Sequence, residues 1–496
     1  MRRQWYGNYD FVINWEDDGR DIRAYKKRPG GSRSGVSNYT YYFREAVTWS
    51  LISSSTFSIR YREPGSIHDV AGMSAFAKDQ DDLFYILGLM GTKLSDHVLQ
   101  MINPTINMQV GDFMRFPVLD MKDSSMVINL VKDNIALSKF DWNSFETSWD
   151  YMGNPLLNLD FYIDKLTNVV TDFKIPAWVV DLQQSNFLRD RVAAYKWLVN
   201  SVFDRVHANE ITLNKIFIDL YGLTDELTPE ISATDITVSR ICDDWEKEAS
   251  DITANPFVLT EEDVVKLFVS FTVGCMLGRY SPFNSDVQVV QKQNPEQEAF
   301  ISITDEYYSD ADLTGQFVKF IEQVLGAETL PQNVEYIGEI LGQGKKEGRL
   351  AIRHYFLSNF YSDHVKMYKK RPIYWQFDSG KQNGFKALIY MQRWSADLIG
   401  DLRVSGVHWI QRIYENEIKN MDDLIEHSDS ARERREAERR RTKLQKQLKE
   451  TRDYDGKIGH LANERKEIDL DDGVKWNYKY VQTSMGDINL NILSKI

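Results

Sequence analysis

Apolar and polar positions alternate in part near the start of the chain and recur with a helical period over most of the remainder. Residues 38–62 are dense in Tyr, Thr, Trp, Phe and Ile with partial alternation, which predicts strands of a half-buried sheet. Residues 83–102 follow an acidic pair and have helical apolar spacing that ends before a proline, which predicts a helix. Residues 106–119 alternate again, so we expect extended structure there. The pattern predicts a compact, mixed α/β domain over residues 1–150.

A polar stretch with several glycines, residues 19–35, precedes the predicted strands. It contains six Lys or Arg residues around Pro29-Gly30-Gly31. Gly and Pro favour tight turns, and charged side chains favour solvent. We therefore expect an exposed loop.

The later part of the chain is dominated by three-to-four spacing, which predicts a mainly helical domain over residues 151–398. Residues 399–466 hold two helical patterns separated by a short polar break, which predicts an antiparallel helical hairpin, a coiled-coil arm. We expect residues 467–496 to form a tail that packs back on the protein. The predicted fold class is therefore α+β, with an N-terminal mixed α/β domain and a mainly α-helical region carrying a long antiparallel hairpin.

Composition and charge narrow the classes of function. Hydrophobic residues make up 42% of the 496 residues, enough to order most of the chain. The net charge of -13 argues against uniform nucleic-acid binding, because affinity for DNA comes from basic groups. Residues 2–62 nevertheless hold eleven Lys or Arg against six Asp or Glu, an excess of five. Any DNA-contact surface is therefore expected near the start of the chain.

The cysteine content and the length of apolar runs indicate the cellular compartment in which we expect the protein. Two cysteines, Cys242 and Cys275, provide neither a disulfide framework nor a zinc-type pairing, which fits a reducing setting. The first twenty residues include charged side chains and do not read as a signal peptide, and no apolar run is long enough to span a membrane. We expect a cytoplasmic protein that does not contact membranes.

The patterns that would indicate an active site are weak. Asn255-Pro256-Phe257 is the nearest match to the corner that holds a flipped adenine, but it has one proline, and a helix-breaking turn is the favoured interpretation. Gly342, Gly344 and Gly348 have glycine-loop spacing without the Lys-Ser/Thr pair of a phosphate loop.

Metal-binding patterns are equally weak. Asp469, Asp471 and Asp472 lack calcium-loop spacing and favour an acidic turn. The eight histidines form no His-Glu-x-x-His site. The sequence therefore indicates no catalytic residue and no metal site in this chain.

Several stretches resemble a known family, the adenine-specific DNA methyltransferases called PglX of BREX phage-defence systems. The resemblance rests on YYFREAVTWSLISSSTFSIRYR (41–62), DVAGMSAF (69–76), residues 81–118, NSFETSWDY (143–151), IFIDLYGLTDELTPE (216–230), VGCMLGRYSPF (273–283), HVKMYKKRPIYWQF (364–377), ALIYMQ (387–392) and EIDLDDGVKWNY (467–478). These stretches resemble the part of PglX that follows its catalytic domain. Residues 106–113 also resemble the element that closes target-recognition domains of type I specificity subunits, and related single-chain restriction-modification enzymes share parts of the pattern.

The resemblance implies target recognition for an adenine-specific methyltransferase, with the catalytic domain outside this chain, so that the gene is split or the chain is a fragment. It implies no cofactor in this chain and S-adenosylmethionine on the methyltransferase domain. The implied partners are double-stranded DNA, the methyltransferase domain or subunit, and other BREX proteins. The resemblance implies that the chain is part of an adenine-specific DNA methyltransferase, but with no methyl-donor or base-pocket motif it does not by itself make this polypeptide an enzyme.

The candidate DNA-binding residues follow from the chemistry of base and phosphate recognition, in which Arg and Lys bind guanine or phosphates and Ser binds phosphates. The first group lies in the predicted loop and strands and comprises Arg20, Arg23, Lys26, Lys27, Arg28, Arg33, Arg44, Ser53, Ser54, Ser55, Arg60 and Arg62. We expect these residues to line a surface facing the major groove. The alternative interpretation is that the cations are ordinary solvated charges and the serines form a tight turn.

Two later basic stretches are weighed in the same way. Lys369, Lys370 and Arg371 stand beside aromatic residues, which suits a backbone clamp, although the aromatics could instead belong to the core. The run 432–449 is strongly basic, but glutamates interleave at helix-pair spacing, so a salt-bridged, solvated helix is favoured. The rival to DNA recognition is a protein-interaction scaffold of the defence complex with incidental DNA contact, which the acidic net charge and the long arm support.

Overall fold

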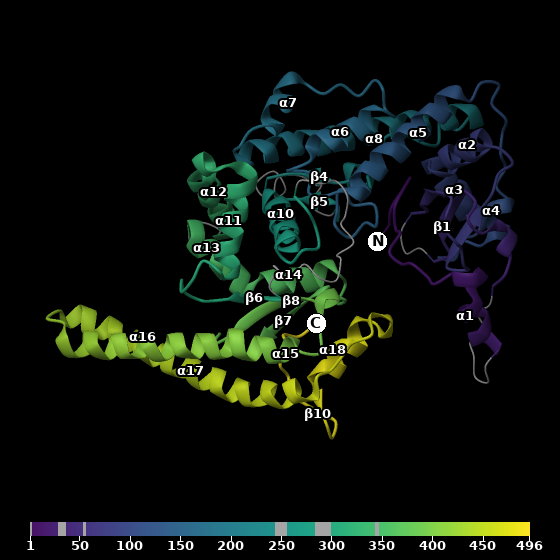
Figure 1. Ribbon diagram of the computed structural model, residues 1–496. Coiled ribbons are helices and arrows are strands. Elements are labelled where there is room, and N and C mark those ends of the chain that lie inside the picture. The colour runs from purple at the N-terminus through teal and green to yellow at the C-terminus, as the bar shows by residue number, and fades with distance from the viewer. Residues whose placement is uncertain (1, 28–35, 53–55, 244–254, 283–298, 343–346) are drawn as a thin grey trace. The chain divides into compact units, whose positions relative to one another are not determined.

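The computed structural model describes residues 2–27, 36–52, 56–243, 255–282, 299–342 and 347–496, and its chain divides into two compact units. The N-terminal unit comprises residues 1–184 and 190–264, and the C-terminal unit comprises residues 185–189 and 265–496. Helices predominate and the sheets are small and mostly antiparallel, which confirms the predicted α+β class (Figure 1).

The N-terminal unit is built around a three-stranded antiparallel sheet of order β2-β1-β3. Its elements are α1 (Glu16–Lys27), η1 (Tyr39–Tyr41), β1 (Ala46–Ser50), β2 (Ile59–Arg62), β3 (Gly72–Ala75), α2 (Gln80–Met90), α3 (Lys93–Ile102), α4 (Val110–Met114), α5 (Ser125–Asn143), α6 (Leu159–Thr167), α7 (Ala177–Gln183), α8 (Leu188–Tyr221), η2 (Ala233–Asp235), β4 (Arg240–Ile241) and β5 (Val258–Leu259). Val47 of the central strand pairs with Tyr61 on one side and with Ala75 on the other. The β-rich composition of residues 38–62 thus forms the strands it predicts.

The extreme N-terminal segment is buried beside this sheet. Trp5 pairs in parallel with Arg60 of β2, and its indole Nε1 donates to Glu210 Oε1 on α8 at 2.7 Å. Burial raises the pKa of Glu210 to about 7, against the opposing effects of the Trp5 hydrogen bond and Arg2. Arg3 Nη1 lies 2.6 Å from Asp141 Oδ2 on α5, and both side chains are almost excluded from solvent. The first residues therefore connect the sheet to the helices of this unit.

Two local predictions for this unit are wrong. Residues 106–119 were expected to be extended, but α4 forms there because Asp112 Oδ2 accepts from Gln109 N at 3.0 Å and from Asn103 Nδ2 at 2.7 Å. This carboxylate satisfies a free amide at the helix start, a local interaction that outweighs the alternating pattern.

The second error concerns the loop expected over residues 19–35, since residues up to Lys27 belong to α1. Asp17, Asp18 and Gly19 have left-handed backbone conformations, so regular helical geometry begins only after Gly19. Residues 28–35 lie outside the described residues.

The C-terminal unit contains a second antiparallel sheet, of order β6-β8-β7, and most of the remaining helices. Its elements are β6 (Phe300–Ile303), α11 (Leu313–Leu325), η4 (Ala327–Thr329), α12 (Leu330–Gly342), α13 (Gly348–Ser358), α14 (Phe360–Met367), β7 (Tyr374–Asp378), β8 (Lys386–Tyr390), η5 (Met391–Arg393), α15 (Leu398–Asp401), the π-helical segment η6 (Leu402–Val407), α16 (His408–His427), α17 (Ala431–Glu464), η7 (Leu470–Asp472), α18 (Val474–Gln482), β9 (Thr483–Ser484) and β10 (Ile488–Asn489). Helix α10 (Glu261–Met276) begins at the end of the N-terminal unit and continues into this one.

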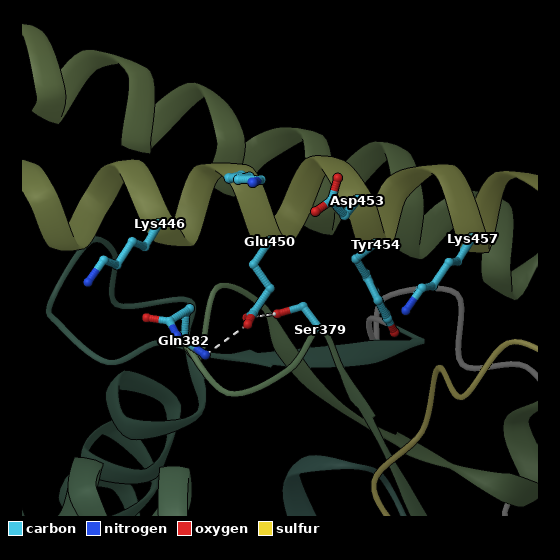
Figure 2. Close-up of a pocket in the computed structure, with 8 residues that line it drawn as sticks. Ser379, Gln382, Lys446, Glu450, Asp453, Tyr454 and Lys457 are labelled. Atoms are coloured by element: carbon cyan, nitrogen blue, oxygen red, sulfur yellow. Dashed lines mark hydrogen bonds between the residues drawn. The ribbon is translucent and has the colours of Figure 1, made fainter.

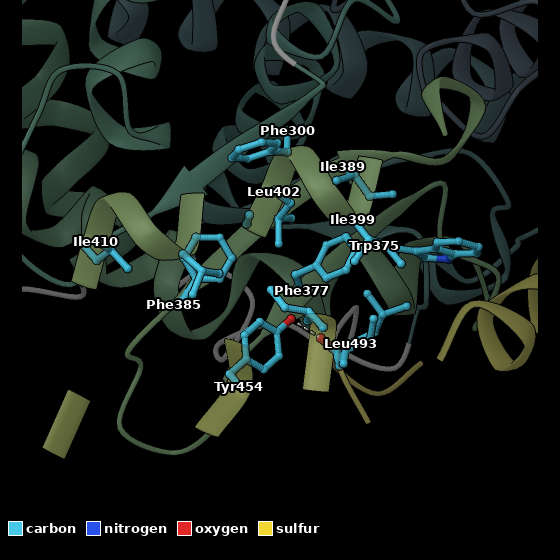
Figure 3. Close-up of a cluster of buried hydrophobic side chains, with 14 of the residues drawn as sticks. Phe300, Trp375, Phe377, Phe385, Ile389, Ile399, Leu402, Ile410, Tyr454 and Leu493 are labelled. Carbon is cyan, nitrogen blue, oxygen red and sulfur yellow. Dashed lines mark hydrogen bonds between the residues drawn. The ribbon is translucent and has the colours of Figure 1, made fainter. Parts of the chain in front are cut away.

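The core of this unit lies between its sheet and the helical hairpin. Phe377 of β7, Leu402 of η6, Tyr454 of α17 and Leu493 of the C-terminal tail belong to one buried cluster (Figure 3). The tail runs along β7, where Asp378 N donates to Ile492 O at 3.0 Å and Ser494 N donates to Gln376 O at 2.8 Å. The chain end thereby completes the edge of the sheet.

Helices α16 and α17 lie side by side as the antiparallel hairpin expected from the sequence (Figure 1). Arg440 pairs with Glu417, and Arg452 pairs with Glu415, at 2.6 and 2.7 Å between the two helices. Within the run 432–449, Arg432 pairs with Glu436 at the helical spacing that the sequence predicted, and Arg440 and Arg441 pair with residues of the facing helix.

A buried histidine in this unit predicts acid sensitivity. His364 Nε2 accepts from Ile373 N and Tyr374 N at 3.2 and 3.1 Å, which requires a neutral ring. Burial, with a smaller effect of Arg279, lowers the pKa of His364 to about 3. The unfolded chain binds this proton near pH 6.5, so stability is present above that pH and is lost as pH falls. We expect His364 alone to reduce the free energy of unfolding by about 2 kcal/mol between pH 7 and 5.

Denaturant titrations at pH 7, 6 and 5 measure this effect. The H364Q variant is expected to lose about 2 kcal/mol of the pH dependence, whatever its stability at pH 7. The exposed His460 provides the control, because H460Q should keep the wild-type dependence. An unchanged pH dependence in H364Q would contradict the assignment.

Candidate nucleic-acid interface

The N-terminal unit presents an arginine surrounded by aromatic rings just before β1. The Arg44 guanidinium is exposed and lies 5.3 Å from the ring centroid of Tyr41 and 5.7 Å from that of Phe76. Tyr41 and Phe76 are themselves in contact, with centroids 4.9 Å apart. The rings hold the planar guanidinium through cation–π contact and leave its N–H groups able to bind a carbonyl or phosphate oxygen.

His68 extends this group, which we call the Arg44 cluster: Tyr41, Tyr42, Arg44, His68 and Phe76. The His68 ring lies 5.0 Å from Tyr42 and 5.4 Å from Phe76, measured between centroids. Burial and the neighbouring Arg62 lower the pKa of His68, which favours the neutral ring. The cluster therefore carries its positive charge on Arg44.

Helix α1 places Arg23 and Arg20 in different electrostatic surroundings. Arg23 Nε donates to Asp18 O at 2.7 Å, and its guanidinium lies 5.9 Å from the Tyr39 centroid. Arg20 instead pairs with three acidic neighbours on the same helix, Glu16, Asp17 and Asp21. Its charge is largely balanced locally, which makes Arg23 the stronger candidate for contact with a polyanion.

Arg60 and Arg62 occupy the sheet rather than the surface predicted for them. Arg60 is 6% exposed and its Nη1 donates to Arg3 O at 3.1 Å, while burial and the adjacent Arg62 lower the pKa of Arg60 to about 10. Arg60 therefore has a structural role and does not belong to the candidate DNA-contact surface. Arg62 is only partly exposed and donates to Thr48 Oγ1 at 3.4 Å. Arg60 and Arg62 are two positions apart on β2, so their side chains lie on the same face of the sheet.

The other predicted residues of the first group are described only in part. Lys26 and Lys27 are the last two residues of α1. Arg28, Arg33, Ser53, Ser54 and Ser55 lie outside the described residues. Of the twelve candidates in the first group, the structure places Arg23 beside Tyr39 and Arg44 beside Tyr41 and Phe76.

Lys369, Lys370 and Arg371 belong to the C-terminal unit, in the turn between α14 and β7. All three are exposed, and Lys369 and Lys370 have left-handed backbone angles, with φ of 51° and 62°. The aromatic half of the proposed clamp is corrected, because Tyr374 and Trp375 are completely buried in β7. The exposed basic turn therefore does not have Tyr374 and Trp375 as stacking partners for a nucleic acid.

The sequence interpretation missed the aromatic members of the Arg44 cluster. Their signal was present, since residues 38–62 are dense in Tyr and Phe, but those residue types were read as strand formers. Tyr39, Tyr41 and Phe43 instead precede β1 and remain exposed. Exposed aromatics near arginines are a recognised feature of surfaces that bind nucleic acids.

The weak catalytic motif has a structural function. The Asn255 amide donates to Ala233 O and Ile236 O at 3.0 and 2.9 Å, and its Oδ1 accepts from Phe257 N at 2.9 Å. These bonds use the groups that would hold a flipped base, and the side chain is buried. The turn interpretation of Asn255-Pro256-Phe257 therefore fits the structure.

Two features are absent from the described residues, a metal-binding cluster and a membrane-spanning helix. The described residues contain no group of three or more His, Cys, Asp or Glu side chains arranged to hold a metal ion. Within the same residues, no helix combines the length and the apolar character needed to cross a bilayer.

Comparison with curated proteins finds similarity to two adenine-specific methyltransferases. The chain is similar over nearly its whole length to curated proteins named adenine-specific methyltransferases. It is 34% identical over 493 residues to the adenine-specific methyltransferase PglX of Lacticaseibacillus casei (strain Zhang), and 30% identical over 510 residues to the adenine-specific methyltransferase BrxX of Escherichia coli O9:H4 (strain HS). The alignments cover 97% and 98% of this chain.

The resemblance to PglX stated from the sequence is confirmed by these identities. The chain spans 38% and 39% of the length of the two relatives, so it corresponds to well under half of each. No protein-family model matches the chain.

Proposed function

We propose that this chain recognises DNA sequence for an adenine-specific DNA methyltransferase of a BREX phage-defence system, with the methyl-transferring domain supplied outside it. The observation that carries the proposal is the similarity of almost the whole chain to less than half of PglX and BrxX. Methylation of an adenine needs a flipped base and a methyl donor, and the choice of adenine needs a separate reading surface. The chain lacks recognisable motifs for the first task and has candidate groups for the second.

The candidate reading surface is the Arg44 cluster together with Arg23 of α1. Arg44 is exposed and held by two rings, so its guanidinium is oriented before DNA arrives. Arginine bound to the O6 and N7 atoms of guanine is the most common specific contact in the major groove. Lys369, Lys370 and Arg371 are proposed as phosphate contacts of the C-terminal unit.

Binding of the full chain to DNA tests the proposal. Selection from randomised duplexes should yield one short preferred site, and the R23A/R44A variant should lose roughly 5- to 100-fold of the preference for that site over a scrambled duplex. K122A/K174A removes two exposed cations elsewhere in the N-terminal unit and should retain the preference. Equal preference in wild type and R23A/R44A, with normal folding, would contradict the proposal.

A protein-interaction scaffold of the defence complex is the second candidate. It is favoured by the consecutive apolar side chains Phe11, Val12 and Ile13, which are all exposed. The scaffold predicts that DNA affinity does not depend on Arg23 or Arg44. The same duplex selection therefore separates the two functions, because a scaffold would yield no preferred site.

A further inference from the structure

The outward face of α17 carries a row of basic side chains that the hairpin does not use. Residues 435, 439, 442, 446, 449, 453 and 457 follow one another at intervals of three or four, so they lie on one side of the helix. This outer stripe consists of Arg435, Arg439, Thr442, Lys446, Lys449, Asp453 and Lys457, all exposed. It contains five cations and one acidic residue.

Five of the six other cations of α17 have partners within the protein, Arg434 being the exception among the described residues, and this sets the stripe apart. Arg432 pairs with Glu436, Arg440 with Glu306 and Glu417, Arg441 with Asp422, Lys443 with Asp305 and Glu306, and Arg452 with Glu415. By contrast, within the described part of the chain the five cations of the stripe form no ion pair. A salt-bridged helix accounts for the first set and leaves the second unexplained.

A hollow beside the stripe brings part of it against the turn between β7 and β8. It has a volume of about 350 Å³, and Lys446, Lys449 and Lys457 contribute to its wall. Glu450, in the same wall, accepts from Ser379 Oγ, Gln382 N and Gly384 N at 2.8, 2.8 and 3.0 Å. Figure 2 shows Lys446 and Lys457 on either side of Glu450, each extending from α17.

The side chains in the wall determine the net charge of the hollow. Both oxygens of Glu450 are occupied by donors of the turn, so the carboxylate does not reach out to the lysines. The wall thus holds two carboxylates, Glu450 and Asp453, against three lysines, a formal excess of one positive charge. The hollow therefore favours an anion with oxygens able to accept from ammonium groups, as phosphate oxygens do.

We propose that the outer stripe of α17 binds the phosphate backbone of double-stranded DNA without reading its sequence. From Arg435 to Lys457 the helix rises about 33 Å, close to the length of one turn of B-DNA. The five cations and one carboxylate of the stripe give it a formal net charge of +4, in a chain whose net charge is -13. The choice of DNA as the polyanion rests on the proposed function, to which the stripe adds a second, sequence-independent contact.

Salt-dependent binding of the full chain to a 40-base-pair duplex without a preferred site tests the inference. K446Q/K449Q/K457Q should weaken binding by roughly tenfold or more, and the slope of log K against log salt should fall by roughly 2 to 3, since each phosphate contact contributes about 0.9. K319Q/R349Q/K419Q removes the same charge from exposed positions of the C-terminal unit outside the stripe and should keep the wild-type slope.

The outcomes separate this inference from the proposed function. Both proposals are supported if the stripe variant binds all duplexes more weakly to the same extent, while only R23A/R44A loses the preference for one site. If the stripe variant and the control variant have the same slope of log K against log salt, the proposed DNA binding by the outer stripe is wrong, whatever the result for Arg23 and Arg44. Stronger binding of an RNA duplex than of a DNA duplex, lost in the stripe variant, would overturn the assignment of DNA as the partner.

Discussion

Substitution of Asp141 by Ala is expected to lower the free energy of unfolding of the N-terminal unit by about 3 to 5 kcal/mol, because it leaves the Arg3 charge buried without its partner. Arg3 Nη1 and Asp141 Oδ2 are 2.6 Å apart, with side-chain exposures of 7% and 4%. The guanidinium also lies over the rings of Trp142 and Phe257, so it cannot move to solvent without breaking those contacts. Asp141 Oδ1 further accepts from Ser239 N at 2.9 Å.

Chemical denaturation and amide exchange of residues 3–6 measure this effect. D141N preserves the size of the side chain but not its charge and should be destabilised in the same sense. R20A removes an exposed arginine with acidic neighbours and should change stability by no more than about 0.5 kcal/mol. A loss below about 1 kcal/mol in D141A would show that the pair contributes little.

Substitution of Phe377 by Ala is expected to destabilise the C-terminal unit by about 3 to 5 kcal/mol, because a buried aromatic ring is replaced by a cavity. Phe377 has no exposed surface and stacks on Trp394, with centroids 6.4 Å apart. It belongs to the cluster that joins β7, η6, α17 and the C-terminal tail (Figure 3). None of these elements can close the space without shifting the others.

Thermal and denaturant unfolding of F377A, F377L and Y307A provide the measurement. F377L should lose less than F377A because it retains part of the volume. Y307A removes an aromatic side chain that is 62% exposed and should leave stability within about 0.5 kcal/mol of wild type. Equal stabilities of F377A and Y307A would contradict the packing described here.

Elements with a long periodic pattern were predicted correctly from the sequence. The prediction failed for a short element whose conformation depends on local hydrogen bonds. The hairpin was predicted because α16 and α17 extend over 20 and 34 residues, enough for helical periodicity to be unambiguous. Helix α4 was missed because its five residues form around the contacts of Asp112. Such contacts depend on one side chain and leave no period in the sequence.

The candidate surface was predictable as a region but not residue by residue. The excess of basic residues near the start of the chain indicated where to look, yet sequence spacing does not show which side of β2 carries Arg60. That side is fixed by the Trp5 segment, which pairs with β2 and covers Arg60. Conversely, the free cations of α17 were obscured by interleaved glutamates, because charge counts do not reveal which pairs form.

The anchorage of α17 gives this helix a mechanical property. Its polar contacts with the unit extend from Arg440, which pairs with Glu306, through Glu450, which accepts from the β7–β8 turn, to Asp455, which pairs with Arg403. Arg435 lies five residues before Arg440, about 8 Å along the axis. A force applied near Arg435 is therefore shared among several anchoring points along the helix, so no single contact has to resist it alone.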